Sequence, residues 1–264
     1  MSYLKKMKKN RLFLSAYYFS VSTKDYFNLN LIGFIKSLAW YLSDYFHYEK
    51  GSKSYNDQFK IYCMCPKLND KTKFTPLEPI YFFQDAWAAK KIFDLKPKHH
   101  YDVGSSAKTI SIISQFVPTT MIDIRPLGLK LENLFFMEGT ILNLPFEDNS
   151  IESISSLCVI EHIGLGRYGD EIDALGSKKA IRELIRVSAH NGIILFSVPV
   201  DEENKVFFNA HRAFTREYII AQFNCCELIE EKYIYGDRLF DNYDPGKGFG
   251  TGLFLFKNKK GNIS

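Results

Sequence analysis

Two groups of residues in this sequence of 264 residues have types and spacings that suit chemistry. The first is a turn of small residues, DVGSSA at positions 102–107, placed between a short apolar segment and a helical pattern. Such a turn lets a ligand approach the backbone and meet free N–H groups. Asp123 follows Asp102 by 21 residues, where a carboxylate can accept hydrogen bonds from both hydroxyls of a ribose. Turn and acid together indicate a nucleoside site of a doubly wound sheet, although such a turn alone is common.

The second group is the segment VIEHIGLGRYGD at positions 159–170. Glu161 and His162 follow a predicted strand, and ligands of open α/β sheets bind beyond the carboxyl ends of strands, so both residues should border the pocket. The glycines of the segment disfavour a helix and leave a loop. This loop presents three side chains that could contact a second bound molecule: Arg167, Tyr168 and Asp170.

The elements that must position these residues begin near residue 99, where short apolar strands alternate with helices. The predicted strands are residues 101–103, 120–124, 134–137, 151–158, 192–198, 228–234 and 253–256, and the predicted helices are residues 109–116, 178–188 and 216–223. Alternation of this kind predicts an α/β fold with a mostly parallel sheet covered on both faces.

The first 98 residues have a different pattern, rich in aromatic residues and partly helical. Apolar residues at three- and four-residue intervals over 31–45 predict an amphipathic helix, and a second helix is predicted over 84–93. The polar stretch 50–57 predicts an extended, irregular connection. We therefore expect two parts: an N-terminal extension over residues 1–98, acting as a lid, a support or a dimer element, and an α/β domain over residues 99–264.

Composition narrows the classes of protein. With 46% hydrophobic and 24% charged residues, the chain is expected to fold, and its apolar stretches end before the ~20 residues that a membrane span needs. A net charge of +4 is too small to indicate a nucleic-acid partner. The basic start followed by apolar residues imitates a signal peptide, but serines interrupt it, so a cytoplasmic protein is expected. The five cysteines form no CxxC pair, which predicts neither a zinc site nor a disulfide framework.

The turn, the acid and a later segment together resemble the class I S-adenosylmethionine-dependent methyltransferases. Their first motif runs acidic-x-Gly-x-Gly-x-Gly, and this chain keeps Asp102 and Gly104 but has Ser106 and Lys108 at the later glycine positions. Asp123 matches their second acidic position. Residues 144–152, LPFEDNSIE, are similar to the family's Leu-Pro-Phe-x-Asp-x-Ser-Phe-Asp segment, which leads into the fourth strand. The resemblance covers roughly residues 99–257.

This resemblance implies a Rossmann-like sheet of seven strands, mostly parallel with the last strand antiparallel, and S-adenosylmethionine as cofactor. The cofactor contacts that it implies are Asp102, Gly104, Ser105, Ser106, Asp123, Ile124, Gly139, Thr140, Ile141 and Cys158. Thr140 stands where the family often has an acid near the adenine, so contacts to the ribose are better supported than contacts to the base.

A narrower resemblance joins residues 159–170 to the segment FFNAHR at 207–212. Together they resemble a methyltransferase-like family of bacterial proteins of unknown function that is associated with surface-polysaccharide gene clusters. The resemblance implies a small-molecule acceptor, either a sugar or a phosphorylated compound, and the inference is one of family association. The expected substrate contacts are Arg167, Tyr168, Asp170, Asn209 and Arg212.

Methyl transfer needs an in-line attack on a sulfonium-bound methyl group, so such an enzyme mainly aligns its substrates and excludes water. A hydroxyl acceptor also needs a base. His162 is the first candidate and His211 the second, while Glu161 either orients the histidine or binds the acceptor. A structural, hydrogen-bonded histidine is the alternative for His162. The acids at positions 170, 171 and 173 form a solvated loop in our interpretation, so no metal is predicted.

Two other functions stay open. A dinucleotide-dependent oxidoreductase shares the strand, turn and acid, but its fingerprint needs glycines at the positions of Ser106 and Lys108. Its Tyr-x-x-x-Lys pair occurs only at Tyr243 and Lys247, across Pro245, where a helix cannot form. The second alternative is a non-catalytic protein that binds a nucleoside or glycan, or a scaffold acting through its aromatic N-terminal part. A homodimer is an expected arrangement of the chain under any of these functions.

Overall fold

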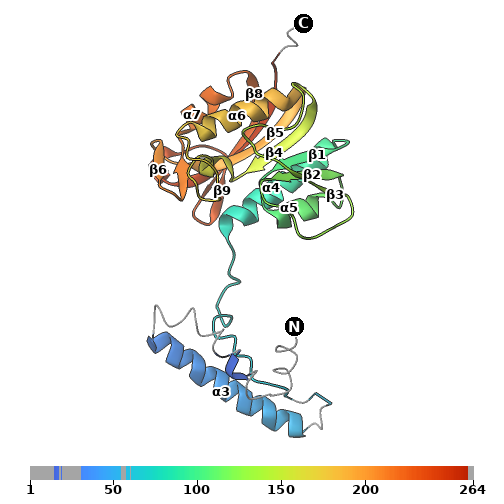
Figure 1. Cartoon of the computed structure of the whole chain (residues 1–264). Helices are drawn as coiled ribbons and strands as arrows, with labels where there is room; N and C mark the ends of the chain where they lie inside the picture. The colour runs from blue at the N-terminus through green and yellow to red at the C-terminus, as the bar shows by residue number, and fades with distance from the viewer. Residues whose placement is uncertain (1–14, 18, 20–30, 55–57, 60, 261–264) are drawn as a thin grey trace. The chain divides into compact units, whose positions relative to one another are not determined.

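The computed structural model describes residues 15–17, 19, 31–54, 58–59 and 61–260, and its chain divides into two compact units, residues 1–76 and 77–264. The first unit contains helix α3 (Leu31–Ser54) (Figure 1). The irregular connection predicted from residue 50 is wrong over 50–54, because α3 continues there and Lys53 pairs with Glu49 one turn earlier at 2.9 Å. The basic and apolar residues at 5–14 and residues 55–57 lie outside the described residues.

The second unit is built on an eight-stranded sheet of order β3-β2-β1-β4-β5-β10-β8-β9. Its strands are β1 (His100–Val103), β2 (Thr119–Asp123), β3 (Leu134–Glu138), β4 (Ile151–Leu157), β5 (Ser188–Val200), β8 (Cys226–Tyr235), β9 (Arg238–Phe240) and β10 (Gly250–Asn258). β1 to β5 pair in parallel, and β10 runs antiparallel to both β5 and β8. The predicted α/β class and mostly parallel, Rossmann-like sheet are confirmed. The sheet has an eighth strand because a tight hairpin at Gly236, with φ of 60°, adds β9 to β8.

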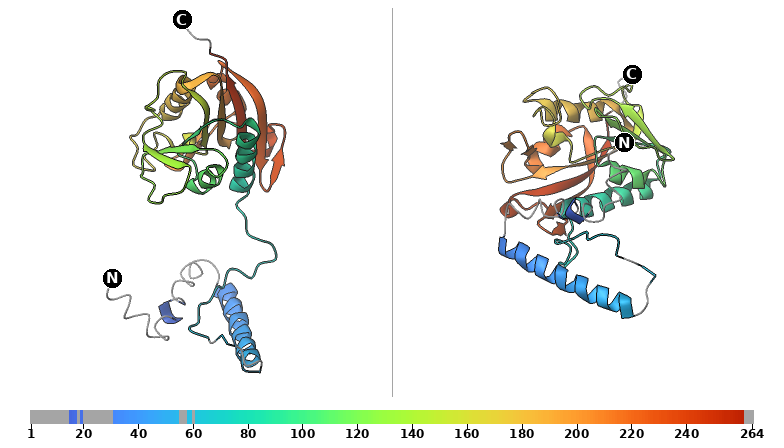
Figure 2. Two further views of the ribbon diagram at one scale, coloured as in Figure 1. Left: turned by 90° about the vertical axis from the view of Figure 1, so that its right-hand side faces the viewer. Right: turned by 60° about the horizontal axis from the view of Figure 1, so that its bottom comes forward.

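Helices cover both faces of this sheet (Figures 1 and 2). α4 (Pro79–Leu95) and α5 (Ala107–Ile113) contribute to one buried cluster, and α6 (Gly176–Val187) and α7 (Arg216–Gln222) contribute to the other. Side chains along β5 alternate between the two clusters, with Leu195 in the first and Ile194 and Phe196 in the second. This alternation is the period of a strand buried on both faces, and it fixes the register of the sheet.

Helix α4, which the sequence pattern places in the N-terminal extension, packs within the sheet unit. Trp87, Ala88 and Ile92 are buried in the same cluster as residues of α5, and the Trp87 indole donates a hydrogen bond of 2.9 Å to Glu230 on β8. One face of α4 is therefore part of the core that supports the sheet. Among the described residues, no helix is long and apolar enough to cross a membrane.

A separate two-stranded sheet, β6 (Lys205–Phe207) with β7 (His211–Ala213), follows β5. The sequence pattern did not predict it because its strands have three residues each and lack a clean alternation of apolar and polar side chains. β7 is tied to the main sheet by the backbone of Phe214, which exchanges hydrogen bonds with the end of β5. The hairpin thereby stands beside the carboxyl end of β5.

Candidate functional site

Two adjoining cavities lie at the carboxyl ends of the parallel strands, where ligands of open α/β sheets bind. The inner pocket has a volume of about 120 Å³ and the outer cleft one of about 1070 Å³. The two share six wall residues: Gly104, Asp123, Arg125, Cys158, His162 and Tyr168. Strand order reverses between β1 and β4. The cavities therefore lie at the switch point of the sheet.

The turn after β1 approaches the end of β4 closely. Gly104 has φ of 75°, and a Cβ built on it would lie 2.9 Å from a methyl carbon of Val159. Both facts require glycine here, because other residues rarely adopt this conformation and would collide with Val159. The backbone conformation and the close approach to Val159 thus require the glycine that the resemblance identified. Because Gly104 has no side chain, its backbone borders both cavities directly.

Asp102 organises this turn from behind. Its buried carboxylate accepts hydrogen bonds from the Ser105 amide at 3.0 Å, the Ser105 hydroxyl at 2.6 Å and the Ser155 hydroxyl at 2.5 Å. The Ser105 hydroxyl also accepts from the amide of Leu157 at 2.9 Å, which ties the turn to β4. Asp102 forms part of neither cavity wall. The structure therefore gives Asp102 a positioning role, in which it shapes the turn without facing the cavities.

His100 extends the same buried network on β1. Its imidazole lies 2.8 Å from the Ser153 hydroxyl and 2.9 Å from the Ser155 hydroxyl. Burial, with a smaller contribution from His99, lowers the pKa of His100 to about 3. Burial raises the pKa of Asp102 to about 6 although three hydrogen bonds oppose the shift. As the pH falls, His100 therefore destabilises the folded state, and Asp102 stabilises it.

We expect Asp102→Asn to steepen the loss of stability in acid. The His100 contribution is complete above the unfolded pKa of ~6.5 and is lost as the pH falls toward 3. The Asp102 contribution has the opposite sign, since it grows as the pH falls from 6 to the unfolded value of ~3.9. The variant loses only the second contribution. Urea unfolding at about pH 6.5 and pH 4.5 measures the difference, and equal acid losses in both proteins would contradict it.

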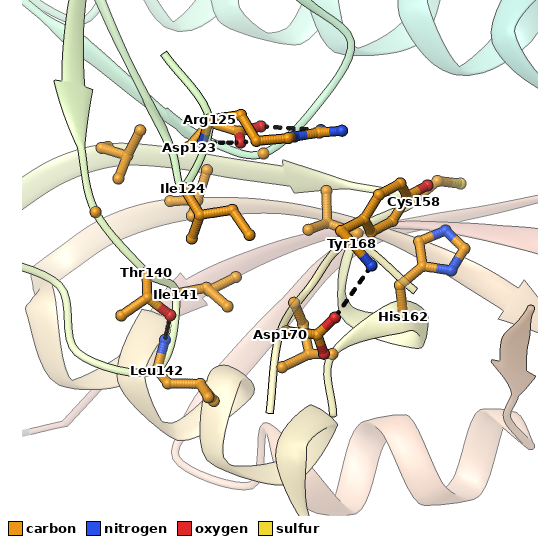
Figure 3. A pocket seen from close by; sticks show the side chains of 16 residues that line it. Asp123, Ile124, Arg125, Thr140, Ile141, Leu142, Cys158, His162, Tyr168 and Asp170 are labelled. Carbon is orange, nitrogen blue, oxygen red and sulfur yellow. Dashed lines mark hydrogen bonds and ion pairs between the residues drawn. The ribbon is translucent and has the colours of Figure 1, made fainter. Parts of the chain in front are cut away.

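Asp123 stands at the end of β2, where the two cavities meet. It is 9% exposed, and its Oδ1 accepts hydrogen bonds from the backbone amide of Arg125 at 2.8 Å and from Arg125 Nε at 3.3 Å. The Arg125 guanidinium also lies over the ring of Tyr168, 4.8 Å from its centre (Figure 3). The carboxylate is thus held in place by its own chain and keeps a surface toward both cavities.

The walls of the inner pocket are largely apolar. Six wall residues come from the end of β2, the residue just after it and the segment after β3: Ile122, Ile124, Gly139, Thr140, Ile141 and Leu142. Ile124, Thr140, Ile141 and Leu142 are labelled in Figure 3. Gly139 lies so close to Ile122 that a Cβ would be 3.0 Å from its methyl carbon. The Thr140 hydroxyl accepts a hydrogen bond from the Leu142 amide at 3.3 Å. A narrow apolar slot of this kind suits a flat, largely apolar ring.

The loop after β4 is organised by Asp170. Its carboxylate accepts hydrogen bonds from the backbone amides of Gly164 at 2.6 Å, Tyr168 at 3.3 Å and Gly166 at 3.4 Å. Burial opposes ionisation of Asp170, but these amides lower its pKa below the ordinary value. Tyr168 borders both cavities, and Asp170 borders the inner pocket. The loop has a defined shape because one ionised side chain satisfies three of its donors.

Arg212 holds the base of this loop. It is 8% exposed and donates hydrogen bonds to the Ile163 carbonyl at 2.6 Å, the Ser177 hydroxyl at 3.0 Å and the Asp173 carbonyl at 3.2 Å. Arg212 and the exposed Asn209 form part of neither cavity wall. We therefore treat Arg212 as a positioning residue, and a substrate contact by either residue stays a prediction.

Glu161 and His162 form a pair at the floor of the outer cleft, in the short helix η1 (Ile160–His162). The His162 Nδ1 lies 2.7 Å from the Ala210 carbonyl. A carbonyl only accepts, so Nδ1 carries the proton and Nε2 keeps its lone pair. Nε2 lies 3.6 Å from Glu161 Oε1. Burial raises the pKa of Glu161 to about 8 and lowers that of His162. Near neutral pH both groups are therefore mainly uncharged.

The second carboxyl oxygen of Glu161, Oε2, is buried and has no hydrogen-bond partner within the part of the chain that the structure describes. The residue as a whole is 2% exposed. A buried acceptor without a partner is costly and rare in folded proteins. His211 and Arg167 also border the outer cleft, and Arg167 donates to the Ala210 carbonyl at 2.9 Å. The three candidate catalytic residues thus lie in one cleft.

The structure adds wall residues that the sequence interpretation missed. Tyr81 and Asp85 reach the outer cleft from α4, one helical turn apart, and Phe249 reaches it from the residue before β10. The Asp85 carboxylate accepts a hydrogen bond of 2.6 Å from the Thr109 hydroxyl. The i, i+4 spacing of Tyr81 and Asp85 was the signal available in the sequence. Nothing in the local pattern marks Phe249 or Arg125 as wall residues.

The predicted cofactor residues divide between the two cavities. Gly104, Asp123, Ile124, Gly139, Thr140, Ile141 and Cys158 line the inner pocket, and Ser105 and Ser106 line the outer cleft. The Cys158 thiol donates to the Gln84 side chain at 3.0 Å. Within the described residues, no group of three or more histidine, cysteine or acidic side chains is arranged to hold a metal ion.

Several solved methyltransferases have the same architecture. A Burkholderia thailandensis 1,6-didemethyltoxoflavin-N1-methyltransferase, solved with its substrate and S-adenosylhomocysteine, aligns with a TM-score of 0.50 at 10% identity, over 72% of this chain and 94% of that one. A candidate sarcosine dimethylglycine methyltransferase from Galdieria sulphuraria aligns with a TM-score of 0.51 at 14% identity, over 67% and 85%. This chain has the Rossmann-like fold of methyltransferases.

A third structure agrees at the level of the fold. A candidate methyltransferase from Bacillus halodurans aligns with a TM-score of 0.50 at 14% identity, over 67% of this chain and 99% of that one. Residues 143–233 match a family described as Caenorhabditis protein of unknown function, DUF268, and this description names no activity. No curated protein matches the sequence. The comparisons therefore define the architecture, and the choice of ligands depends on the cavities.

Proposed function

We propose that the chain is an S-adenosylmethionine-dependent methyltransferase. The observation that carries the proposal is the position of Asp123, a carboxylate at the end of β2 that borders both cavities beside the thin turn at Gly104. A carboxylate at this point of a doubly wound sheet can accept hydrogen bonds from the two hydroxyls of a ribose. The fold shared with solved methyltransferases supports the same assignment.

The residues around Asp123 fit an adenosyl group. The apolar inner pocket can take the base between Ile124 and Ile141, with the Thr140 backbone at its edge. The turn at Gly104 leads from the inner pocket into the outer cleft, where the methionine part and the acceptor would lie. Ser106 and Lys108, which replace two motif glycines, belong to the wall of the outer cleft and leave the inner pocket unaffected.

The proposed reaction moves a methyl group to a hydroxyl oxygen. The cofactor supplies this group on a sulfonium, and the protein must align the hydroxyl, exclude water and remove one proton. Glu161 and His162 are the candidates for proton removal, since both border the outer cleft and Glu161 Oε1 lies 3.6 Å from His162 Nε2. His211 is a second candidate on the opposite hairpin, and burial lowers its pKa, so it is available as a neutral base.

The sequence resemblance supports a sugar-related or phosphorylated small molecule as the acceptor, used in surface-glycan biosynthesis within the cytoplasm. Arg167 supports an acceptor of this chemistry because its guanidinium borders the outer cleft and makes no ion pair within 4 Å among the described residues. A guanidinium can bind a phosphate or carboxylate through paired hydrogen bonds. The proposal includes no nucleic-acid partner.

Calorimetry with S-adenosylhomocysteine and with NAD⁺ tests this proposal on the full chain. We expect S-adenosylhomocysteine to bind with a dissociation constant on the order of micromolar, and NAD⁺ to give no measurable heat. The apolar slot and the Asp123 carboxylate at its border are suited to one adenosyl group. Binding of NAD⁺ in place of S-adenosylhomocysteine would replace the proposal by the oxidoreductase alternative.

A further inference from the structure

Two residues of the outer cleft each have a buried polar atom without a hydrogen-bond partner in the described part of the chain, Glu161 Oε2 and Thr251 Oγ1. Glu161 Oε2 is buried and has no hydrogen-bond partner in the described part of the chain, although its residue borders the cleft. His162 is less free to meet a ligand, since its Nδ1 is bonded to Ala210 and its Nε2 faces Glu161 Oε1. The Thr251 hydroxyl can accept a hydrogen bond but does not take up a proton, so the atom that can both accept from a ligand hydroxyl and take its proton is Glu161 Oε2.

Three aromatic rings pack together and form a cup, defined here as Phe207, His211 and Phe249, of which His211 and Phe249 border the outer cleft. The ring centres of Phe207 and His211 are 4.9 Å apart, and those of His211 and Phe249 are 5.5 Å apart. Phe207 is 44% exposed and Phe249 is 46% exposed. Exposed aromatic surface next to a deep cleft with convergent polar groups is typical of a ligand site.

The angles within the cup favour a puckered ring over a flat one. Phe207 and Phe249 are inclined by 89°, His211 and Phe249 by 53°, and Phe207 and His211 by 38°. Because no two of these rings are parallel, the cup offers no slot in which a planar aromatic ring could be stacked between two faces. A saturated ring can place its C–H groups against several inclined faces at once.

The polar groups around the cup indicate hydroxyl groups on the ligand. The Tyr81 side chain, the Asp85 carboxylate and the Arg167 guanidinium border the same cleft as Glu161. A ligand with several hydroxyls can donate to the acids and accept from Arg167, whereas a ligand with a single polar group would leave most of them to water. An ammonium group would face the positive charge of Arg167, so a cationic acceptor is disfavoured.

We propose that the outer cleft binds its acceptor as a saturated, hydroxyl-bearing ring, with one face against the cup and one hydroxyl donating to Glu161 Oε2. This inference rests on the proposed function. During transfer the hydroxyl oxygen forms a bond to the methyl carbon while the methyl–sulfur bond breaks, so the sulfonium becomes a neutral thioether. The hydroxyl proton moves to Glu161 in its ionised form, which is the minor form near neutral pH and the major form above about pH 8, and charge is conserved.

Saturation-transfer NMR on the full chain tests the cleft without knowledge of the natural acceptor. The probes are the methyl pyranosides of glucose, galactose, mannose and N-acetylglucosamine, with phenol as the planar comparator, each measured with and without S-adenosylhomocysteine. The variants are Phe249→Ala, which removes part of the cup, and Glu161→Leu, which removes the unpaired oxygen at similar volume. Phe93→Ala is the matched control, because Phe93 is 57% exposed and packs on Phe116 outside the cleft.

We expect at least one pyranoside to bind, and to bind about tenfold more weakly to Glu161→Leu and about fivefold more weakly to Phe249→Ala. Phe93→Ala should bind as the unmodified protein does. Glu161→Leu should unfold at the same urea concentration or a higher one, because it removes an unsatisfied buried acid. Weaker sugar binding without lower stability separates a ligand contact from a structural role.

Other outcomes overturn the inference and leave the proposed function standing. If S-adenosylhomocysteine binds but no pyranoside does, the cleft does not take this class of acceptor. If phenol binds and the pyranosides do not, the acceptor is planar. If a pyranoside binds equally to Phe249→Ala and Glu161→Leu, it binds elsewhere. Failure of S-adenosylhomocysteine to bind would count against the proposed function alone, since the pyranosides are also measured without it.

Discussion

Replacing Asp123 with alanine is expected to weaken S-adenosylhomocysteine binding by on the order of 100-fold. A ribose offers two hydroxyl donors to one carboxylate, and hydrogen bonds to a charged group contribute about 1.5–3 kcal/mol each. Part of this gain is offset to the extent that the ribose competes with Arg125 Nε, which already donates to Asp123 Oδ1 at 3.3 Å. Calorimetry on the variant measures the remaining loss directly.

Glu138→Ala provides the matched control for this experiment. Glu138 ends β3 as Asp123 ends β2, and the two residues are paired in the strand register, but Glu138 is exposed and borders neither cavity. We expect the control to bind S-adenosylhomocysteine with unchanged affinity. Asp123→Asn, which keeps one acceptor oxygen, should fall between the two. Equal affinities of Asp123→Ala and the unmodified protein would remove the ribose assignment and with it the central support of the proposed function.

The strands of the main sheet could be predicted because their apolar side chains face two helical layers. β1, β2 and β4 are nearly continuous runs of buried residues, and such runs bounded by turns are readable in a sequence. β9 and the β6–β7 hairpin were missed because strands of three residues are too short to show such a signature, and β6 and β9 are also mostly exposed. The hairpin is also the element that carries His211 to the cleft and Phe207 to its side.

Within the candidate site, the sequence indicated which residues come together more reliably than what each one does. Glu161, His162 and His211 meet in one cleft, as their positions after β4 and β5 imply. The division of roles depends on details that spacing cannot show. The Ala210 carbonyl sets the tautomer of His162 from 48 residues away, and Glu161 is left with an unpaired oxygen among the described residues. These contacts are tertiary, so no local pattern encodes them.

The motif acid and the motif arginine illustrate the same limit. Asp102 and Arg212 were both assigned to ligands, and those contacts stay predictions. The hydrogen bonds that the structure gives them lie inside the protein, to a serine turn and to loop carbonyls respectively. A charged residue in a motif can serve the ligand indirectly, by fixing the backbone that meets it. Burial separates the two roles, and burial of one polar side chain is poorly determined by its neighbours in sequence.

Gly164→Ala is expected to lower the free energy of unfolding by about 3 kcal/mol and to abolish S-adenosylhomocysteine binding. Gly164 has φ of 81°, and a Cβ placed on it would lie 2.1 Å from the Asp173 carbonyl oxygen. This contact cannot be relieved by a side-chain rotation, because the obstacle is backbone. The two ends of the loop are also hydrogen-bonded to each other, because the Asp173 amide donates to the Gly164 carbonyl at 3.0 Å.

Gly169→Ala separates backbone strain from this collision. Gly169 lies in the same loop with φ of 87°, but a Cβ there would have no described atom within 4 Å. Gly169→Ala should therefore lower the free energy of unfolding only by the cost of placing alanine in a left-handed conformation, about 1 kcal/mol. It should keep the affinity for S-adenosylhomocysteine. The extra loss in the free energy of unfolding of Gly164→Ala, relative to Gly169→Ala, is then the cost of opening the loop at Asp173. Since Asp170 anchors the amide of Gly164 at 2.6 Å, that opening also withdraws Tyr168 from Arg125 and dismantles the wall of the inner pocket. Equal losses of stability and affinity in the two variants would show that the loop base yields without disturbing the cavity.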